Sequence, residues 1–252
     1  MTLHGKTAII TGGSGGIGLA TAKRFLELGV TGLMLVDLRE DELQKAKDSL
    51  DSEYVFTYAA DVSKSYDVEN YTRKAFEIMG KVDILFLNAG IEGVVMPLTE
   101  YPEDVFDKVL SVNVKGVWLG MKYAFPLMKQ GGSVIITSSV AGLRGTAKVM
   151  AYTASKHGTI GVMRVAALEG APQNIRVNTI HPSPVDNRMM RSLEEGFAPG
   201  AGSEVKKGFE QMIPLGRYAV NEDIANLVVF LASDESKFIT GATYAIDGGF
   251  TV

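Results

Sequence analysis

The sequence predicts an α/β fold, a doubly wound sheet of seven parallel strands with helices on both faces. Short runs rich in β-branched residues alternate with longer amphipathic stretches along the whole chain, as in parallel strands joined by crossover helices. The apolar runs lack period-two alternation, which is expected when helices cover both faces of a sheet. We expect strands at residues 6–11, 31–37, 54–59, 82–88, 132–138, 174–180 and 243–246, and helices at 16–28, 40–50, 64–79, 102–129, 151–170 and 221–232.

The 252 residues are expected to form one domain, residues 1–252, because no repeat, linker or low-complexity tract divides them. One connection is unusually long. The segment of about 183–215 contains Pro184, Pro199 and Pro214 and has a partly helical middle. Long connections in compact domains are often functional, so we predict a substrate-binding loop or lid there.

Composition disfavours several classes of protein. The 25 basic and 29 acidic side chains give a net charge of −4 without a block of like charge, which disfavours nucleic-acid binding. Every apolar run is shorter than the roughly 20 residues that cross a bilayer. The chain has no cysteine, and its three histidines show no metal-ligand spacing, so we expect neither disulfides nor a metal site. No export signal is visible at the N-terminus, and a cytoplasmic location is expected.

A glycine-rich turn leaves the first predicted strand and opens the first predicted helix. Glycines in this context let backbone N–H groups approach a pyrophosphate at the helix N-terminus, as in Rossmann-type dinucleotide sites. The turn runs from Thr11 to Gly18, and its candidate cofactor-binding residues are Gly12, Ser14, Gly15, Gly16, Ile17 and Gly18.

An acidic residue follows the second predicted strand. Asp37, with Leu38 beside it, lies roughly 20 residues after the glycines, where a carboxylate can accept hydrogen bonds from the adenosine ribose. Because the same charge repels a 2′-phosphate, NAD is preferred over NADP. Arg39 lies close enough to leave NADP open.

Tyr152 and Lys156 are four residues apart, so on a helix they share one face. A phenol with an ordinary pKa of roughly 10 is a poor base at neutral pH, but a neighbouring ammonium lowers that pKa. Tyr152 is therefore a candidate acid/base. A solvated helix face is the alternative when the pair is considered alone.

Further motifs make the chain resemble the short-chain dehydrogenase/reductase family over essentially its full length. The family's Thr-Gly-x-x-x-Gly-x-Gly turn matches Thr11 to Gly18, and its Asn-Ala-Gly matches Asn88-Ala89-Gly90. Its active-site asparagine matches Asn113. Ser139 stands thirteen residues before Tyr152, which is the family spacing.

The resemblance implies a role for each matched residue. Ser139 would hold the substrate oxygen against Tyr152, Lys156 would bind the nicotinamide ribose and lower the Tyr152 pKa, and Asn113 would hold a water on a proton path. Ser138 competes with Ser139 for the serine role, but the count to Tyr152 favours Ser139.

The resemblance also implies contacts further from the chemistry. Asp61 and Val62 would contact the adenine, and the segment Asn88, Ala89 and Gly90 would pack beside the adenosine ribose. A homotetramer would assemble through the predicted helices 102–129 and 151–170.

The sequence departs from the family pattern after the sixth predicted strand. Ser183 stands where the family has glycine, and Asn187 stands where it has a threonine that binds the nicotinamide carboxamide. We still expect Pro182, Val185 and Asn187 to bind this part of the cofactor.

The substrate residues are the least constrained by the sequence. The long connection carries Met189 and Met190 within an apolar set that suits a lid over a mainly apolar ligand, although ordinary lid packing explains them equally well. Family position adds Val94 and Leu143 as possible apolar wall.

Together these observations predict an oxidoreductase that transfers a hydride between NAD(H) and a small-to-medium, largely apolar secondary alcohol or ketone. Within enzymes the alternatives are a sugar or polyol dehydrogenase and a 3-oxoacyl-thioester reductase. The alternative from another class is a non-catalytic regulator that senses the dinucleotide.

Overall fold

The computed structural model describes residues 1–128 and 131–252. It contains a parallel sheet of seven strands in the order β3-β2-β1-β4-β5-β6-β7, which confirms the predicted fold class. The strands are β1 (Thr7–Thr11), β2 (Gly32–Asp37), β3 (Val55–Ala59), β4 (Ile84–Leu87), β5 (Gly132–Thr137), β6 (Ile175–Pro182) and β7 (Thr243–Ile246).

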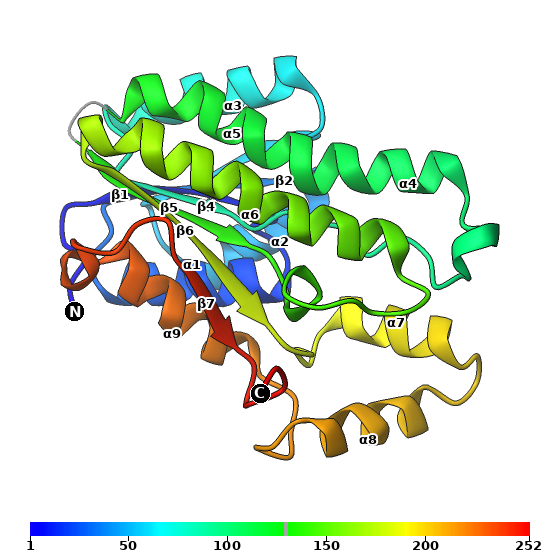
Figure 1. Cartoon of the computed structure of the whole chain (residues 1–252). Helices are drawn as coiled ribbons and strands as arrows, with labels where there is room; N and C mark the ends of the chain where they lie inside the picture. The colour runs from blue at the N-terminus through cyan, green and yellow to red at the C-terminus, as the bar shows by residue number, and fades with distance from the viewer. Residues whose placement is uncertain (129–130) are drawn as a thin grey trace.

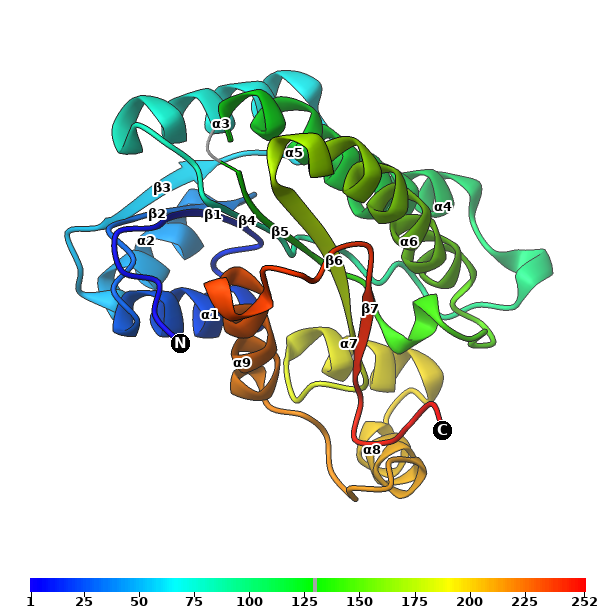
Figure 2. The same cartoon turned by 60° about the vertical axis from the view of Figure 1, so that its left-hand side comes forward.

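Helices cover both faces of the sheet, so the molecule has three layers (Figure 1, Figure 2). The helices α3, α4, α5 and α6 lie on one face, and α1, α2 and α9 lie on the other. Their bounds are α1 (Gly16–Glu27), α2 (Glu40–Leu50), α3 (Ser65–Met79), α4 (Glu103–Leu110), α5 (Gly116–Ala124), α6 (Met150–Gly170) and α9 (Asn221–Ala232). No helix within residues 1–128 and 131–252 is both long and apolar enough to cross a membrane.

Each face of the sheet has its own apolar core. Successive side chains of a strand point to opposite faces, so Ile9 joins the core under α3, α5 and α6, while its neighbours Ala8 and Ile10 join the core under α1, α2 and α9. All five residues of β1 are buried. The strands therefore read as continuous apolar runs because helices exclude water from both sides.

The helix predicted at 102–129 is divided in the structure. The helices α4 and α5 are joined by a π-helical turn at Ser111–Lys115, and the short 3-10 turn Phe125–Leu127 follows α5. Residue 129 lies outside the described residues. The π-helical turn carries Asn113, and π turns inside helices are frequent at functional sites.

Two helices form most of the segment 183–215. They are α7 (Arg188–Phe197) and α8 (Gly202–Met212), and both lie beyond the carboxyl end of β6 (Figure 1). The rings of Phe197 and Phe209 meet edge to face with their centroids 5.9 Å apart. We call these two helices the cap.

The strand order places a crevice at the carboxyl edge of the sheet. The chain moves outward from β1 through β2 to β3, and then returns to the other side of β1 with β4. Ligands of open α/β sheets bind at this reversal, because the loops after the two neighbouring strands diverge there. The glycine-rich turn after β1 and the Asn88 segment after β4 border this crevice.

The glycine-rich turn leaves no room for side chains at two positions. Gly12 has a φ of +65°, which favours glycine, and a Cβ added at Gly18 would lie 2.1 Å from the Gly12 carbonyl oxygen. Gly18 therefore lets the first turn of α1 pack against the backbone of the turn.

The variant Gly18→Ala should lose stability, by about 1–3 kcal/mol for overpacking at a site whose neighbour is backbone. Chemical denaturation measures the free energy of unfolding. Gly208→Ala is the matched control, since Gly208 lies on the exposed side of α8 and an added Cβ meets nothing within 4 Å. Equal stability of Gly18→Ala and Gly208→Ala would contradict this account of the turn.

Candidate functional site

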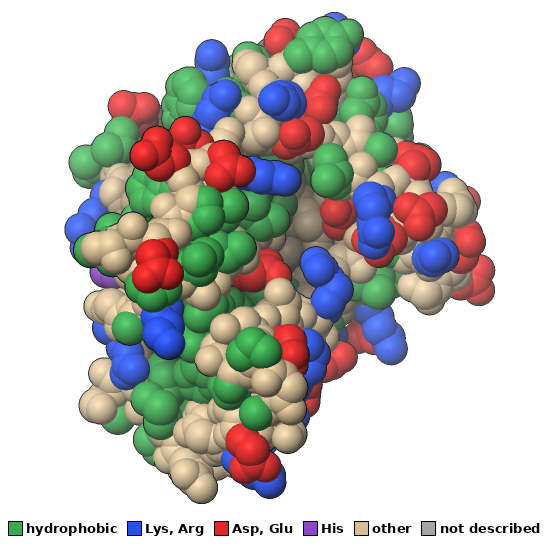
Figure 3. Space-filling view, turned by 90° about the vertical axis from the view of Figure 1, so that its right-hand side faces the viewer, with side chains coloured by type: hydrophobic (Ala, Val, Ile, Leu, Met, Phe, Trp, Pro, Cys, Tyr) green, Lys and Arg blue, Asp and Glu red, His purple; other side chains and the backbone are tan. Residues whose placement is uncertain are grey.

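A cavity of about 1110 Å³ opens at the crevice between β1 and β4. The space-filling view shows the surface hollowed at the centre of this side (Figure 3). Most residues predicted to bind cofactor or substrate line this one cavity: Gly12, Gly15, Gly16, Ile17, Asp37, Leu38, Asp61, Val62, Asn88, Ala89, Gly90, Ser139, Tyr152, Lys156, Pro182, Val185, Asn187, Met189 and Met190.

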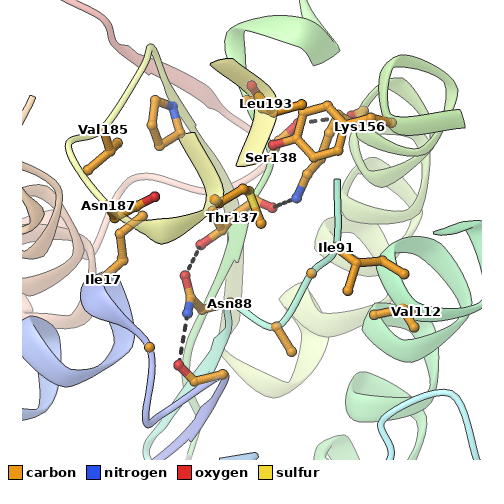
Figure 4. Close-up of a pocket in the computed structure, with 18 of the residues that line it drawn as sticks. Ile17, Asn88, Ile91, Val112, Thr137, Ser138, Lys156, Val185, Asn187 and Leu193 are labelled. Atoms are coloured by element: carbon orange, nitrogen blue, oxygen red, sulfur yellow. Dashed lines mark hydrogen bonds between the residues drawn. The ribbon is translucent and has the colours of Figure 1, made fainter. Parts of the chain in front are cut away.

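Side-chain hydrogen bonds join the ends of three strands at the mouth of the crevice. The Thr11 hydroxyl oxygen accepts hydrogen bonds from the backbone N–H groups of Asn88 (3.0 Å) and Ala89 (3.1 Å). The Asn88 side chain donates to the Gly12 carbonyl (3.3 Å) and accepts from the Thr137 hydroxyl (3.0 Å), as Figure 4 shows. We call this set of contacts the strand-end clasp, and it fixes where β1, β4 and β5 end.

Asp37 is held in place by the glycine-rich turn. Its Oδ2 accepts from the Ser14 hydroxyl (2.6 Å) and the Ser14 backbone N–H (3.1 Å), and its Oδ1 accepts from Leu38 N–H (2.8 Å). Ser14 itself does not line the cavity, and its hydroxyl is engaged with Asp37, so its direct contact with the cofactor stays a prediction. Arg39 forms an ion pair with Glu42 on α2.

Gly18 and Asp61 also have structural partners. Gly18 is buried against the Gly12 backbone and does not line the cavity, so its contact with the cofactor stays a prediction. Asp61 lines the cavity, and its Oδ1 accepts from the backbone N–H (2.9 Å) and hydroxyl (2.7 Å) of Ser63. Asp61 thus caps the turn after β3.

Ser139, Tyr152 and Lys156 come together where β5 ends beside α6. Lys156 Nζ donates to the Thr137 carbonyl oxygen (2.8 Å) and lies 5.4 Å from the centroid of the Tyr152 ring. Ser139 Oγ accepts from Ala141 N–H (3.1 Å). The Ser138 hydroxyl donates instead to the Lys156 carbonyl (2.9 Å) inside the protein, which leaves Ser139 as the serine available to a ligand.

Burial governs the protonation of this pair. It raises the pKa of Tyr152 to about 12, against the lowering effect of the Ser139 hydroxyl and with a further raising contribution from Glu92. Burial also lowers the pKa of Lys156 to about 8. The predicted lowering of the Tyr152 pKa by Lys156 is therefore not found, because desolvation of the phenol dominates. At neutral pH the phenol holds its proton and most Lys156 side chains are charged.

Asn113 lies behind the cavity and does not line it. Its Oδ1 accepts from Ile91 N–H (2.9 Å), and its Nδ2 donates to the Ile91 carbonyl (2.9 Å) and the Ser155 hydroxyl (2.9 Å). Both ends of the buried amide are thus engaged with protein, and they tie the loop after β4 to α6. The predicted role of Asn113 in holding a water stays a prediction.

The loop after β6 brings Pro182, Val185 and Asn187 to the cavity. The Asn187 side chain accepts a hydrogen bond from Met190 N–H (3.3 Å) and caps the N-terminus of α7. Its Nδ2 group is the part of the side chain suited to donate to a carboxamide oxygen.

The end of the cavity under the cap is mainly apolar. Met189 and Met190 line it as predicted, whereas Val94 and Leu143 do not. Leu143 follows the short turn Val140–Gly142 and is 39% exposed, and the Val94 backbone N–H is held by the Tyr101 hydroxyl (3.3 Å). Leu193, Phe197 and Phe209, which belong to the apolar set predicted for the lid, line it as well, and the apolar lining residues that the sequence analysis missed are Val140, Val149 and Phe250.

Two missed residues carry backbone or charge contacts at the site. Thr137 supplies both the carbonyl for Lys156 and the hydroxyl for Asn88, and its position at a strand end was the available signal. Arg144 lines the cavity, donates to the Phe250 carbonyl (3.2 Å) and stacks on the Phe250 ring. No local sequence pattern connects positions so far apart.

Comparison with known proteins places this geometry among oxidoreductases. A model of the family described as enoyl-(acyl carrier protein) reductase matches residues 12–251. Levodione reductase of Leifsonia aquatica is 36% identical over 251 residues, covering 97% of this chain and 93% of that protein. The trans-4-hydroxycyclohexanecarboxylate dehydrogenase of Sinomonas cyclohexanicum is 37% identical over 257 residues, covering 98% of this chain and 93% of that protein.

Solved structures agree with these relatives. The crystal structure of levodione reductase matches with a TM-score of 0.95 and covers 98% of this chain and 97% of its own. The crystal structure of NAD⁺-bound xylitol dehydrogenase matches with a TM-score of 0.93 at 32% identity, and covers 99% of this chain and 100% of its own.

The buried Lys156 should make stability depend on pH. Its pKa is about 8 in the folded protein against 10.5 for an exposed lysine, so between these values the unfolded state binds more protons and stability rises with pH. As the pH rises across this window, the free energy of unfolding of the wild-type protein should increase by about 1–3 kcal/mol relative to that of Lys156→Met. Urea denaturation at several pH values measures the difference. Lys115→Met, at an exposed lysine, is the control, and a wild-type protein whose stability runs parallel to Lys156→Met refutes the prediction.

Proposed function

This chain belongs to the short-chain dehydrogenase/reductase family, and we propose that it transfers a hydride between NAD(H) and a secondary alcohol or ketone with Tyr152 as the acid/base. The observation that carries the proposal is the meeting of Ser139, Tyr152 and Lys156 in the same cavity as the glycine-rich turn and Asp37. A dinucleotide site and a proton-transfer site are thereby adjacent, as hydride transfer with coupled proton transfer requires.

The lining residues suit a dinucleotide along the length of the crevice. The glycine-rich turn would hold the pyrophosphate, Asp37 the adenosine ribose, and Lys156 the nicotinamide ribose. The backbone at Val185 and the amide of Asn187 would hold the carboxamide. When bound, the cofactor supplies or accepts the hydride at its nicotinamide ring.

The protein's own part in the reaction is positioning and proton transfer. The Ser139 hydroxyl would donate to the substrate oxygen and hold it beside the phenol. In reduction, the protonated Tyr152 donates its proton to the carbonyl oxygen as the C–H bond forms; in oxidation, the alcohol proton returns to the phenolate. The Ser139 hydroxyl lowers the pKa of the phenol and so opposes the desolvation that disfavours this phenolate. The apolar walls under the cap exclude water from the reacting centre.

NAD is the proposed cofactor because of Asp37. Its carboxylate is anchored by Ser14 and Leu38 at the crevice, where it repels a 2′-phosphate. The pairing of Arg39 with Glu42 weakens the one feature that left NADP open. The NAD⁺ bound to the related xylitol dehydrogenase supports the same choice.

Two enzyme alternatives and one non-enzyme alternative remain testable. The xylitol dehydrogenase structure favours a polyol substrate, and the description of the matching family model favours an acyl thioester. The apolar wall under the cap favours a less polar alcohol or ketone over a polyol. A dinucleotide-sensing regulator would not need Ser139, Tyr152 and Lys156 together.

We also propose a homotetramer and a cytoplasmic location. Support for the tetramer comes from large apolar side chains left exposed on α5 and α6, namely Trp118, Val165 and Leu168. Support for the location comes from the sequence, which has no cysteine.

The variant Tyr152→Phe tests the acid/base assignment. Loss of the hydroxyl should lower kcat by about 10²–10⁴-fold, since general acid–base catalysis contributes that much, while NADH binding is retained. NADH absorbance measures turnover with alcohols, polyols, ketones and 3-oxoacyl thioesters, and quenching of protein fluorescence measures binding. Tyr66→Phe, at an exposed tyrosine, is the control. If Tyr152→Phe keeps wild-type turnover, Tyr152 is not the acid/base. If the wild-type protein binds NADH but turns over none of these substrates, the dinucleotide-sensing regulator is favoured.

The variant Asp37→Ala tests the cofactor preference. Removal of the repelling charge should raise the ratio of kcat/KM for NADP to that for NAD by about 10–100-fold, equivalent to 1.4–2.7 kcal/mol. Initial rates with both cofactors give the ratio. Asp41→Ala changes a nearby exposed acid on α2 and should leave the ratio unchanged. A wild-type preference for NADP would overturn the assignment of Asp37.

A further inference from the structure

His181 is fully buried directly beneath the serine of the proposed site. It lies on β6 beside the end of β5, and both of its ring nitrogens have partners. Nδ1 lies 2.8 Å from the Ser139 carbonyl oxygen, and Nε2 lies 2.9 Å from the Thr179 hydroxyl. The imidazole therefore bridges the centre of β6 and the backbone of Ser139.

The partners define the tautomer of the ring. A carbonyl oxygen only accepts hydrogen bonds, so Nδ1 must carry the hydrogen that is donated to Ser139. Burial lowers the pKa of His181, so the ring is neutral and Nε2 carries no hydrogen. Nε2 then accepts from the Thr179 hydroxyl. The hydrogen bonds run in one direction, from Thr179 through His181 to Ser139.

His181 supplies a hydrogen-bond donor at a point where the backbone of β6 has none. The ladder between β5 and β6 reaches Ser138, whose N–H donates to the Ile180 carbonyl (2.9 Å). Pro182 follows His181 and has no N–H, so β6 offers no backbone donor at the next position. The imidazole supplies a side-chain donor one residue beyond the end of this ladder, to the carbonyl of Ser139, where β5 passes into the turn that carries the serine.

Ser139 needs such a restraint because its hydroxyl must be aimed. Its backbone is extended, its carbonyl also accepts from Gly142 N–H (2.8 Å), and its hydroxyl oxygen accepts from Ala141 N–H (3.1 Å). Rotation of the Ser139 peptide would swing the hydroxyl relative to Tyr152. Misplacement of a positioning group by about 1 Å can cost on the order of 10²-fold in rate.

We propose that His181 is a positioning residue that orients Ser139 toward Tyr152 through the hydrogen bond from Nδ1 to the Ser139 carbonyl. The proposal rests on the proposed function, in which the Ser139 hydroxyl holds the substrate oxygen. His181 touches neither substrate nor cofactor and acts only through Ser139.

A double-mutant cycle between His181 and Ser139 tests this role. His181→Leu removes the donor while keeping an apolar side chain in the space, and should lower kcat about 10–100-fold with little change in the KM for NAD. In a Ser139→Ala background the same change should cost less than about threefold, because no serine hydroxyl remains to be aimed. Effects that multiply in the double mutant overturn the proposal, as does a His181→Leu protein with wild-type kcat.

Two further variants separate positioning from stability. Thr179→Val removes the partner of Nε2 but leaves the Nδ1 donor. It should therefore lower Tm while kcat stays near the wild-type value. His181→Asn can place an amide N–H near the position of Nδ1 and should recover most of the lost kcat, whereas His181→Gln should not. If His181→Leu fails to fold, the Asn and Gln variants are compared at matched stability, and equal kcat values for the two refute the proposal. Loss of turnover in Ser139→Ala tests the proposed function separately.

Discussion

The ends of three parallel strands are held together by hydrogen bonds of two side-chain hydroxyls and one amide. Thr11, Asn88 and Thr137 form the strand-end clasp at the place where the strand order reverses, and polar groups at these ends would otherwise face a crevice without partners. The strand-end clasp fixes the positions from which the elements of the site begin. The glycine-rich turn leaves from one side of it, and the Thr137 carbonyl that holds Lys156 forms the other.

The site combines this rigid edge with two titrating groups removed from water. Burial moves the pKa of Tyr152 up and the pKa of Lys156 down, so each change disfavours the charged form of its group. The Ser139 hydroxyl acts in the opposite direction on the phenol. The balance among these effects sets how readily the phenol gives up its proton, and the positions of Ser139 and Lys156 are both determined by the end of β5.

Much of this arrangement was predictable from the sequence. Seven strands, their order of appearance and the helices between them follow from the alternation of apolar runs, because two-sided burial leaves a strong signal. The glycine-rich turn, Asp37 and the spacing of Ser139, Tyr152 and Lys156 are likewise local patterns. Their meeting in one cavity follows from the rule that parallel strands share a carboxyl edge.

What escaped prediction depends on contacts between distant parts of the chain. Val94 and Leu143 were assigned to the cavity by family position, but the direction of a loop side chain depends on neighbours such as Tyr101 that no spacing reveals. The pKa of Tyr152 was predicted from one neighbouring charge, whereas the structure adds the desolvation of the whole pocket. The hydrogen bond from the Ser14 hydroxyl to Asp37 was likewise not foreseen, because it joins residues 23 positions apart.

The cap has its own internal connections, and these bear on how a ligand enters. Asp186, just before α7, forms ion pairs with Arg191 of α7 (2.6 Å) and Lys206 of α8 (2.9 Å), and the Phe197–Phe209 contact joins the same helices. Exposed ion pairs are individually weak, but here they act beside an aromatic contact across the same two helices. The two helices are therefore tied to each other. The segments on either side are tied to the body, since Asp186 N–H donates to the Ala219 carbonyl (2.8 Å) and Leu215 N–H donates to the Gly248 carbonyl (3.1 Å). Any opening of the cap would have to break these flanking hydrogen bonds while α7 and α8 stay together.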